Sequence, residues 1–428
     1  MTMHTDILIV GSGAAGLFCS LQLPSDKKIL IITKKEATDS DSFLAQGGIC
    51  VLKSEEDYDS YFEDTMRAGH YENRKESVDI MLRSSQSVID DLVYYGVDFE
   101  KENGKFCYTR EGGHSDSRIL FHKDITGQEI TSTLLDRVRE RENITILEHT
   151  TMYDLLVRDN TCFGVMAQAE NGENYPITAD YTILACGGLG GIYKHSTNYR
   201  HITGDALAIA MKHDIKLEHI DYIQIHPTTL YSEKPGRRFL ISESVRGEGA
   251  VLLNKNGDRF VNELLPRDLL TKKVRRQMEI DDMPYVHLSM APIPKDIIIS
   301  HFPNIYRRCL EEGYDCTKEP IPVVPAQHYF MGGIWVDRNS HTSMEHLYAI
   351  GETSCNGVHG RNRLASNSLL ESLVFAHRAA VHAVSQYKAL PPQTFQAATD
   401  NNLTELSETY KNTLLQAIEQ ERKRNNHE

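Results

Sequence analysis

Three glycines near the N-terminus have a spacing that suits phosphate binding. Gly11, Gly13 and Gly16 follow a short apolar run in the segment DILIVGSGAAG, residues 6–16. In such a segment the first glycine permits a tight turn, the second lets the backbone approach a pyrophosphate, and the third lets a helix pack on its strand. The unpaired N–H groups of that helix then face the phosphates. The pattern predicts the seat of an adenine dinucleotide, against a purely structural turn as the alternative. Its residues are Gly11, Ser12, Gly13, Ala14, Ala15 and Gly16.

Polar side chains that could bind carboxylates stand much later in the chain. Guanidinium and imidazole groups are the usual donors to carboxylates. We expect most of these residues in loops or at element ends, where a rigid scaffold presents functional side chains. Each is ambiguous alone, because an arginine before an apolar helix is often a structural ion pair and a single histidine often binds a backbone carbonyl. The candidates to bind carboxylates are His226, Ser242, His328 and Arg363, and Glu243 and Arg267 stand in the same part of the chain.

Length and composition limit the possible classes of protein. A chain of 428 residues with 40% hydrophobic residues can form two or three domains with large cores. A net charge of −14 without a long basic stripe argues against nucleic-acid binding. No run approaches the about 20 apolar residues of a membrane span, and no signal peptide precedes residue 6, so we expect a cytoplasmic protein. The eight cysteines form no C-x-x-C pair, so we expect small buried thiols and no metal site.

Around the glycines, the sequence predicts a strand at residues 7–10, a helix at residues 17–23 and a second apolar strand at residues 28–33. Lys34 and Lys35 follow that second strand, where nicotinamide-binding folds often place an acid, and this weakens a nicotinamide interpretation. The next segment, DSFLAQGG at residues 41–48, has paired glycines that suit close approach of a backbone loop to a flat ligand.

The middle of the chain alternates helices and strands. Residues 55–95 and 126–141 have helical periodicity, with breaks at Asn73, Gly96 and residues 103–104. Strands are expected at residues 144–147, 151–157, 163–169 and 181–185, with a turn at residues 171–172. The last of these strands ends in Cys186, Gly187 and Gly188. Asp205 opens a helix at residues 206–213, where it could be the N-cap or a cofactor contact.

The character of the sequence changes after residue 219, which indicates an inserted domain. We expect an α/β fold: a Rossmann-like dinucleotide-binding domain at residues 1–219 and 330–388, and an α+β capping domain at residues 220–329. The first domain resumes near residue 331, has its last core strand at residues 347–350 and closes with the segment HGRNRLASNSLLE at residues 359–371. After a linker at Pro391 and Pro392, residues 395–424 predict a helical tail, within a third unit at residues 389–428.

The order of GSGAAG, SFLAQGG, YTILACGG and HGRNRLASNSLLE resembles the flavoprotein family that contains succinate dehydrogenase, fumarate reductase and L-aspartate oxidase. The resemblance spans residues 6–385 and implies that the dinucleotide is FAD. Respiratory members bind FAD covalently through a histidine in the SFLAQGG loop, and Asp41 stands at that position here, so we expect non-covalent FAD. Besides the glycine-rich turn, the implied FAD contacts are Lys34, Ser42, Phe43, Ala45, Gln46, Gly47, Gly48, Gly187, Asp205, Glu352, Asn367, Ser368 and Leu369.

The same resemblance assigns roles to the polar residues. It implies that Arg363 with His328 binds one carboxylate of a dicarboxylate, and that His226 with Ser242 binds the other. Arg267 matches the arginine that relatives use for proton transfer, although a guanidinium is effectively always protonated and simple electrostatic stabilisation stays open. Glu243 either relays protons or holds Arg267.

Within the family, three segments match L-aspartate oxidases: TREGGHS, PAQHYFMGG and ASNSLLE. Glu111, in the first of them, would pair with a substrate ammonium, whereas an isolated loop glutamate is usually a solvated charge. The match implies oxidation of L-aspartate to iminoaspartate, with electrons passed to oxygen, giving hydrogen peroxide, or to fumarate. In relatives this is the first step of NAD biosynthesis through quinolinate, with possible hand-over to quinolinate synthase.

Alternatives are a soluble fumarate reductase that also oxidises succinate, or a non-catalytic flavin-binding partner subunit. One departure is Arg361, where relatives usually have alanine, so we expect an altered access route for substrate. Relatives also usually continue into a C-terminal three-helix bundle, of which residues 389–428 could form only part.

Overall fold

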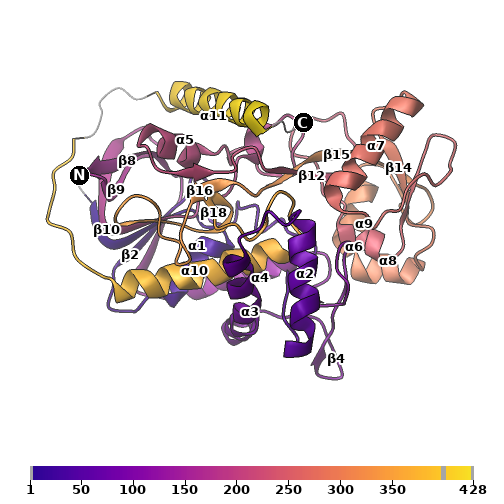
Figure 1. The fold of residues 1–428 in the computed structure, drawn as a ribbon, viewed down its shortest axis with the longest axis horizontal. Coiled ribbons are helices and arrows are strands. Elements are labelled where there is room, and N and C mark those ends of the chain that lie inside the picture. The colour runs from indigo at the N-terminus through magenta and orange to yellow at the C-terminus, as the bar shows by residue number, and fades with distance from the viewer. Residues whose placement is uncertain (1–2, 397–401, 426–428) are drawn as a thin grey trace.

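The computed structural model describes residues 3–396 and 402–425 (Figure 1). Its strands are β1 (Met3–Val10), β2 (Ile29–Ile32), β3 (Ile49–Cys50), β4 (Lys101–Glu102), β5 (Lys105–Phe106), β6 (Ile119–Leu120), β7 (Ile144–Leu147), β8 (Thr150–Arg158), β9 (Thr161–Ala169), β10 (Asn174–Leu184), β11 (Leu217–Glu218), β12 (Ile223–Leu230), β13 (Val251–Leu253), β14 (Val286–Ser289), β15 (Ile321–Phe330), β16 (Gly333–Trp335), β17 (Leu347–Ala349) and β18 (Ser354–Cys355). Its α-helices are α1 (Ala14–Gln22), α2 (Tyr58–Ala68), α3 (Lys75–Tyr95), α4 (Thr126–Arg139), α5 (Asp205–Lys212), α6 (Glu243–Gly247), α7 (Arg267–Asp281), α8 (Lys295–His301), α9 (Pro303–Glu311), α10 (Asn367–Ser385) and α11 (Leu403–Asn425).

A seven-stranded sheet forms the centre of the larger part of the molecule. Its strands run in the order β7, β2, β1, β10, β9, β8, and β17 pairs with β10 beside β9. Strands β7, β2, β1, β10 and β17 are parallel, whereas β8 and β9 are antiparallel. The α/β architecture predicted from the sequence, including the strand near residue 347, is therefore confirmed. Parallel strands bring their carboxyl ends to one edge, where ligands of such folds bind.

Helices cover both faces of this sheet, because alternate residues of each strand point to opposite sides. Ile7 and Ile9 of β1 belong to a core that also contains the apolar residues of α1, α3, α4 and α10. Leu8 and Val10 face the other way, into a second core with α5 and α11. Figure 1 shows α10 and α11 on opposite sides of the sheet. Burial of β1 on both faces explains its uninterrupted apolar sequence.

The glycine-rich turn connects β1 to α1 as its sequence predicts. Gly11 has φ +116°, and a Cβ at this position would collide with the carbonyl oxygen of Ala185 at the end of β10. A Cβ on Gly16 would collide in turn with the carbonyl oxygen of Gly11. Helix α1 begins at Ala14, three residues earlier than expected, because Gly13 is its N-cap. The turn therefore places the helix N-terminus directly at the carboxyl edge of the sheet.

The residues from β12 to β15 form a second, smaller layer. Four antiparallel strands in the order β12, β15, β14, β13 pack with α6, α7, α8 and α9, and their core lies entirely within residues 230–323. This part lies to one side of the large sheet in Figure 1. Its apolar core is separate from the two cores of the large sheet.

The structure bears on three further expectations, about the tail helix, the cysteines and a membrane-spanning helix. The tail helix α11 begins at Leu403 rather than at residue 395; residues 395 and 396 are irregular, and residues 397–401 lie outside the described part. Cys107 and Cys186 are only half-buried, unlike the other six cysteines. Within residues 3–396 and 402–425, no helix combines the length and the apolar character needed to cross a bilayer.

Candidate functional site at the sheet edge and under the second layer

One cavity of about 700 Å³ runs from the glycine-rich turn to the residues of the second layer. This volume lies in the range of sites for cofactors and small ligands. All seven residues predicted to act on a substrate line it: Glu111, His226, Ser242, Glu243, Arg267, His328 and Arg363. Of the residues predicted to contact FAD, all but Ala14, Gly16 and Asn367 line it as well. Residues more than 300 positions apart in the chain therefore share one site.

Lys34 and Asp205 form an ion pair at the end of the cavity nearest to β2. Lys34 also donates to the carbonyl oxygen of His201 at 3.0 Å, and Thr203 Oγ1 donates to Asp205 Oδ1 at 2.5 Å. The N-cap alternative for Asp205 is wrong, because Gly204 is the N-cap of α5 and Asp205 is its first residue. Asp205 therefore neutralises Lys34 beside the cavity.

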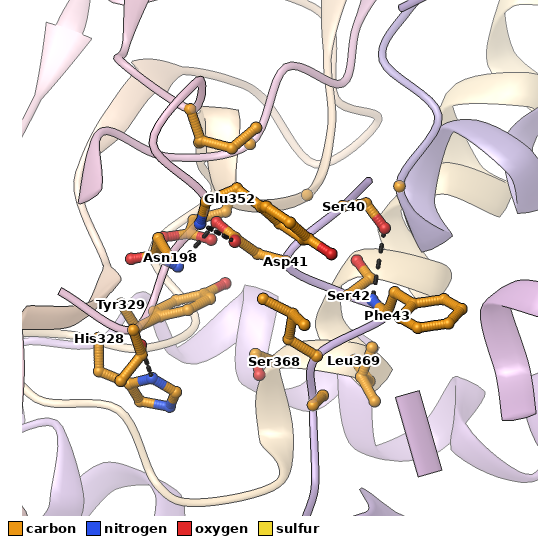
Figure 2. Close-up of a pocket in the computed structure, with 18 of the residues that line it drawn as sticks. Ser40, Asp41, Ser42, Phe43, Asn198, His328, Tyr329, Glu352, Ser368 and Leu369 are labelled. Atoms are coloured by element: carbon orange, nitrogen blue, oxygen red, sulfur yellow. Dashed lines mark hydrogen bonds between the residues drawn. The ribbon is translucent and has the colours of Figure 1, made fainter. Parts of the chain in front are cut away.

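The loop at residues 40–48 forms one wall, and Asp41 is fixed within it (Figure 2). Asn198 Nδ2 and the backbone N–H of Tyr199 donate to the two oxygens of the Asp41 carboxylate at 2.7 and 2.8 Å. Burial raises the pKa of Asp41 to about 7. Burial likewise raises the pKa of Glu352, on the same cavity, to about 8, although Glu352 accepts from the backbone N–H of Phe330 at 2.9 Å.

The N-terminus of α10 also borders the cavity, beside this loop: a Cβ on Gly47 would lie 3.2 Å from Ser366 Oγ. Ser368 and Leu369 line the cavity, as Figure 2 shows, whereas Asn367 accepts a hydrogen bond from the hydroxyl of Tyr61 at 2.8 Å. Ser366 has φ +60°, an unusual conformation for a residue with a side chain. The first N–H groups of a helix lack partners within the helix and favour an electron-rich ligand atom.

These features fit an FAD molecule. The turn at Gly11 and the N-terminus of α1 offer N–H groups to a pyrophosphate, and α10 offers a second helix N-terminus further along the cavity. The buried Oε1 atom of Gln46 has no hydrogen-bond partner among the described residues, although Gln46 lines the same cavity. An unpaired buried acceptor costs free energy unless a ligand donates to it.

Two arginines meet where the second layer covers the cavity. Arg267, the first residue of α7, donates from Nε to Glu243 Oε2 at 2.6 Å and from Nη1 to Gln224 Oε1 at 2.9 Å. Arg363 donates to the same Gln224 oxygen at 3.3 Å and to Ser368 Oγ at 2.7 Å. Burial, and then the charge of Arg267, lowers the pKa of Arg363 to about 10. The arrangement concentrates positive charge on two buried side chains that line the cavity, where it attracts carboxylates.

Gln224 and Arg246 were not predicted from the sequence. Gln224 is buried two residues before His226 in β12, so the strand period that places both on one face was the available signal. Arg246 is buried with Nη2 at 3.6 Å from Glu243 Oε2. Burial alone would raise the pKa of Glu243, but Arg267 and Arg246 together lower it. Glu243 is therefore a carboxylate held between two guanidinium groups.

The two histidines lie within strands, so the expectation of loops or element ends is wrong for them. His226 lies in β12 and His328 in β15, and their rings are 5.2 Å apart. A register shift between His226 and Thr229 lets His226 turn into the site without ending the strand. Burial, followed by the charge of Arg267, lowers the pKa of both well below the ordinary value. Both are therefore neutral at pH 7.

Each histidine is oriented by one ring nitrogen. Nδ1 of His328 contacts Thr197 Oγ1 at 2.8 Å, and Nδ1 of His226 lies 3.0 and 3.2 Å from the backbone O and N of Thr228. Nε2 of His226 is buried without a hydrogen-bond partner among the described residues. The contact of Nδ1 with the Thr228 N–H belongs to the tautomer with a proton on Nε2, which can donate to a carboxylate, whereas the contact with the Thr228 carbonyl oxygen belongs to the other tautomer.

Glu111 is buried, with 4% of its surface exposed, so the solvated-charge alternative is wrong. Ser244 Oγ donates to its Oε1 at 2.7 Å and Ser366 Oγ donates to its Oε2 at 2.6 Å. Neither serine was predicted from the sequence. Across residues 3–396 and 402–425, no lysine, arginine or histidine forms an ion pair with Glu111. Among the described side chains, the Glu111 carboxylate therefore accepts hydrogen bonds from these two hydroxyl groups alone.

Arg361 behaves differently from Arg363. Its Nε atom lies 3.7 Å from Glu72 Oε1, and its backbone N–H donates to the carbonyl oxygen of Gly69 at 3.2 Å. Arg361 is not among the described residues that line the cavity. An effect of Arg361 on substrate access stays a prediction.

The fold and the site define the class of protein: a flavoprotein with an FAD-binding sheet and a second layer over its cavity. Residues 6–369 match the family model described as the FAD binding domain. The structure is also similar to a variant of the quinol fumarate reductase FrdA of E. coli, with a TM-score of 0.84, 28% identity, and coverage of 99% of this chain and 75% of that one.

Curated relatives narrow this class. The L-aspartate oxidase of Clostridium perfringens is 52% identical over 382 residues, which cover 89% of this chain and 87% of that protein. The L-aspartate oxidase of Clostridium acetobutylicum is 49% identical, with 89% and 88% covered. The chain belongs to the L-aspartate oxidase family, within the flavoproteins that share the FAD binding domain.

Proposed function

We propose that this protein oxidises L-aspartate to iminoaspartate with FAD. The observation that carries the proposal is Glu111, a buried carboxylate that lines the cavity without an ion-pair partner among the described residues. The charges of Arg246 and Arg363 act on it only from a longer distance than an ion pair, and a buried carboxylate is costly unless a cation joins it closely. The ammonium group of L-aspartate supplies that cation, whereas succinate and fumarate have none. Glu111 lines the same cavity as Arg267 and Arg363, which matches a substrate that carries both an ammonium group and carboxylates.

The remaining side chains divide the substrate between them. Arg363 with His328 binds one carboxylate, and His226, whose ring lies 5.2 Å from that of His328, binds the second through Nε2. Two fixed anchors hold the substrate in one orientation, which converts binding into positioning of the C2–H bond. Ser242 lines the same cavity as His226 and Glu111, and its role is taken up below. We propose that residues 220–329 form the cap that excludes water from these contacts.

Arg267 and Glu243 act on protons near the reacting carbon. Nε and Nη1 of Arg267 are fixed by Glu243 and Gln224, which leaves Nη2 for the substrate. In that position it stabilises negative charge that develops on the substrate, and a proton passing through it would continue to Glu243. FAD held in this cavity would supply the hydride acceptor, and oxygen, giving hydrogen peroxide, or fumarate would be the final electron acceptor.

FAD is held without a covalent bond in this proposal. The carboxylate of Asp41 is already bonded to Asn198 and Tyr199, and a carboxylate lacks the imidazole nitrogen through which respiratory relatives are attached. Lys34, the glycine-rich turn and the N-terminus of α10 would hold the cofactor. Iminoaspartate is reactive toward water, so we also propose hand-over to quinolinate synthase.

The direct test mixes the purified flavoprotein anaerobically with L-aspartate or with succinate and follows bleaching of the flavin absorbance. We expect bleaching by L-aspartate. Bleaching by succinate alone would instead support a succinate-oxidising fumarate reductase, and no bleaching by either would support a non-catalytic partner subunit. Acid treatment that releases all flavin would support non-covalent binding.

Glu111→Gln sharpens the same test. Glutamine keeps the size of the side chain and can still accept from Ser244 or Ser366, but it cannot pair with an ammonium. We expect the kcat/KM for L-aspartate to fall by about 10- to 100-fold, while inhibition by succinate changes little. Full turnover of L-aspartate by this variant would exclude the assigned role of Glu111. Glu142→Gln, at an exposed position after α4, is the matched control.

A further inference from the structure

Ser244 links Glu111 to Ser242 in a chain of hydrogen bonds. Its Oγ atom lies 2.7 Å from Glu111 Oε1 and 3.1 Å from Ser242 Oγ, and its backbone N–H donates to Ser242 Oγ at 3.3 Å. Ser242 is the N-cap of α6 and Ser244 is the second residue of this short helix. Ser242, unlike Ser244, lines the cavity together with Glu111.

The carboxylate fixes the direction of the protons in this chain. An ionised carboxylate only accepts hydrogen bonds, so Ser244 gives its single hydroxyl proton to Glu111. The contact between the two serines then requires that Ser242 gives its own proton to Ser244. Ser366 donates to the other oxygen of Glu111 and competes with neither. One lone pair of Ser242 Oγ accepts from the Ser244 N–H, so this atom presents its one remaining lone pair, and no proton, to the cavity.

This direction matters for recognition. Glu111 and Ser242 together form a pair of hydrogen-bond acceptors, in a site whose cationic groups, Arg267 and Arg363, are donors and whose other nearby carboxylate, Glu243, is already bonded to Arg267. A substrate ammonium has three N–H donors and can satisfy both acceptors. A carboxylate or a methylene group at the same place has no donor, and a carboxylate oxygen would face the lone pair of Ser242.

We propose that Ser244 is a positioning residue that determines specificity for an amino-bearing dicarboxylate. It orients Glu111 and, by taking the proton of Ser242, keeps Ser242 as an acceptor on the substrate side. The proposal rests on the proposed oxidation of L-aspartate and adds a residue that does not touch the substrate. It also revises the role that the resemblance gave to Ser242, since Ser242 now contacts the ammonium rather than a carboxylate.

Ser244→Ala tests the proposal because it has opposite effects on two ligands. Without Ser244, Glu111 loses one donor and Ser242 regains a free proton that it can give to a carboxylate. We expect the KM for L-aspartate to rise about tenfold, while the dissociation constant of succinate, measured from its perturbation of the flavin spectrum, falls or stays constant. Ser244→Thr keeps the hydroxyl group and should restore both values toward those of the wild type.

Other outcomes would overturn the proposal. Parallel weakening of L-aspartate and succinate would show a merely structural role, and unchanged values for both would show that Ser244 does not act on the site. Ser385→Ala, which removes an exposed serine from the last position of α10, controls for the loss of a helical hydroxyl group. Failure of the proposed function is distinguishable, because L-aspartate would then not bleach the flavin of the wild type. The dissociation constant of succinate for Ser244→Ala would still show whether Ser242 has regained its proton.

Discussion

Arg267 and Arg363 donate to the same oxygen atom, Oε1 of Gln224, at 2.9 and 3.3 Å. The amide nitrogen of Gln224 is fixed in turn by Asn362 Oδ1 at 2.9 Å and by the carbonyl oxygen of Arg363 at 2.8 Å. Two like charges in a buried site repel each other, and a shared acceptor offsets part of that repulsion. Gln224 therefore sets the spacing of the two groups proposed to bind and activate the substrate.

Gln224→Leu should disturb both arginines at once. Leucine fills a similar volume but leaves two buried guanidinium donors without their shared acceptor. We expect the kcat/KM for L-aspartate to fall about 10- to 100-fold, the usual loss for a buried hydrogen bond to a charged group. Steady-state kinetics on flavin-loaded protein measure this. Gln386→Leu, at an exposed position after α10, is the control, and an unchanged kcat/KM in Gln224→Leu would contradict the positioning role.

Arg267→Lys and Glu243→Gln separate the two roles considered for Arg267. Lysine keeps the charge but cannot reproduce the planar fork that bonds Glu243 and Gln224, so we expect kcat to fall about 10²- to 10⁴-fold. If Glu243 only holds Arg267, its glutamine replacement can still accept from Nε and should retain most of kcat. If Glu243 receives the proton, both variants should lose a similar factor. Flavin content, measured in parallel, verifies that neither variant has lost the cofactor.

The sequence predicted the cofactor side of the site better than the substrate side. Glycine positions follow local backbone geometry, so the turn at Gly11 and Gly16 was readable from spacing alone. His226 and His328 were identified but assigned to the wrong kind of position, because a strand irregularity cannot be read from composition. Gln224 and Ser244 were missed, since a neutral amide or a hydroxyl becomes informative only when distant segments place its partner, Arg267 or Glu111, beside it.

Asp41→Asn should change the pH dependence of stability. The pKa of Asp41 rises from 3.8 to about 7 on burial, so the folded chain binds more protons than the unfolded chain between about pH 4 and pH 7. The free energy of unfolding of the wild type therefore falls through this window, by up to about 1.4 kcal/mol per pH unit from this group. Asparagine does not titrate. The free energy of unfolding of the variant should therefore rise relative to that of the wild type as the pH rises to about 7, and the difference between the two should stay constant above that pH.

Denaturant unfolding of the FAD-loaded proteins at pH 5 and pH 8 measures this gain. Asp26→Asn, at an exposed position, is the matched control and should show no such dependence. The same difference between Asp41→Asn and the wild type at both pH values would show that Asp41 is ionised throughout, and the raised pKa would then be wrong.

Gly11→Ala and Gly172→Ala distinguish backbone strain from close approach. Both glycines have positive φ, +116° and +86°, but a Cβ on Gly11 would meet the backbone of Ala185, whereas a Cβ on Gly172 would meet nothing within 4 Å. Gly172→Ala should therefore cost only the conformational strain, about 1 kcal/mol. Gly11→Ala adds overpacking between β1 and β10, for a total of about 2–4 kcal/mol, and should lose FAD affinity because the turn must shift. Thermal unfolding and flavin titration measure both effects, and equal losses in the two variants would contradict the close contact between the turn and β10 on which the cofactor seat depends.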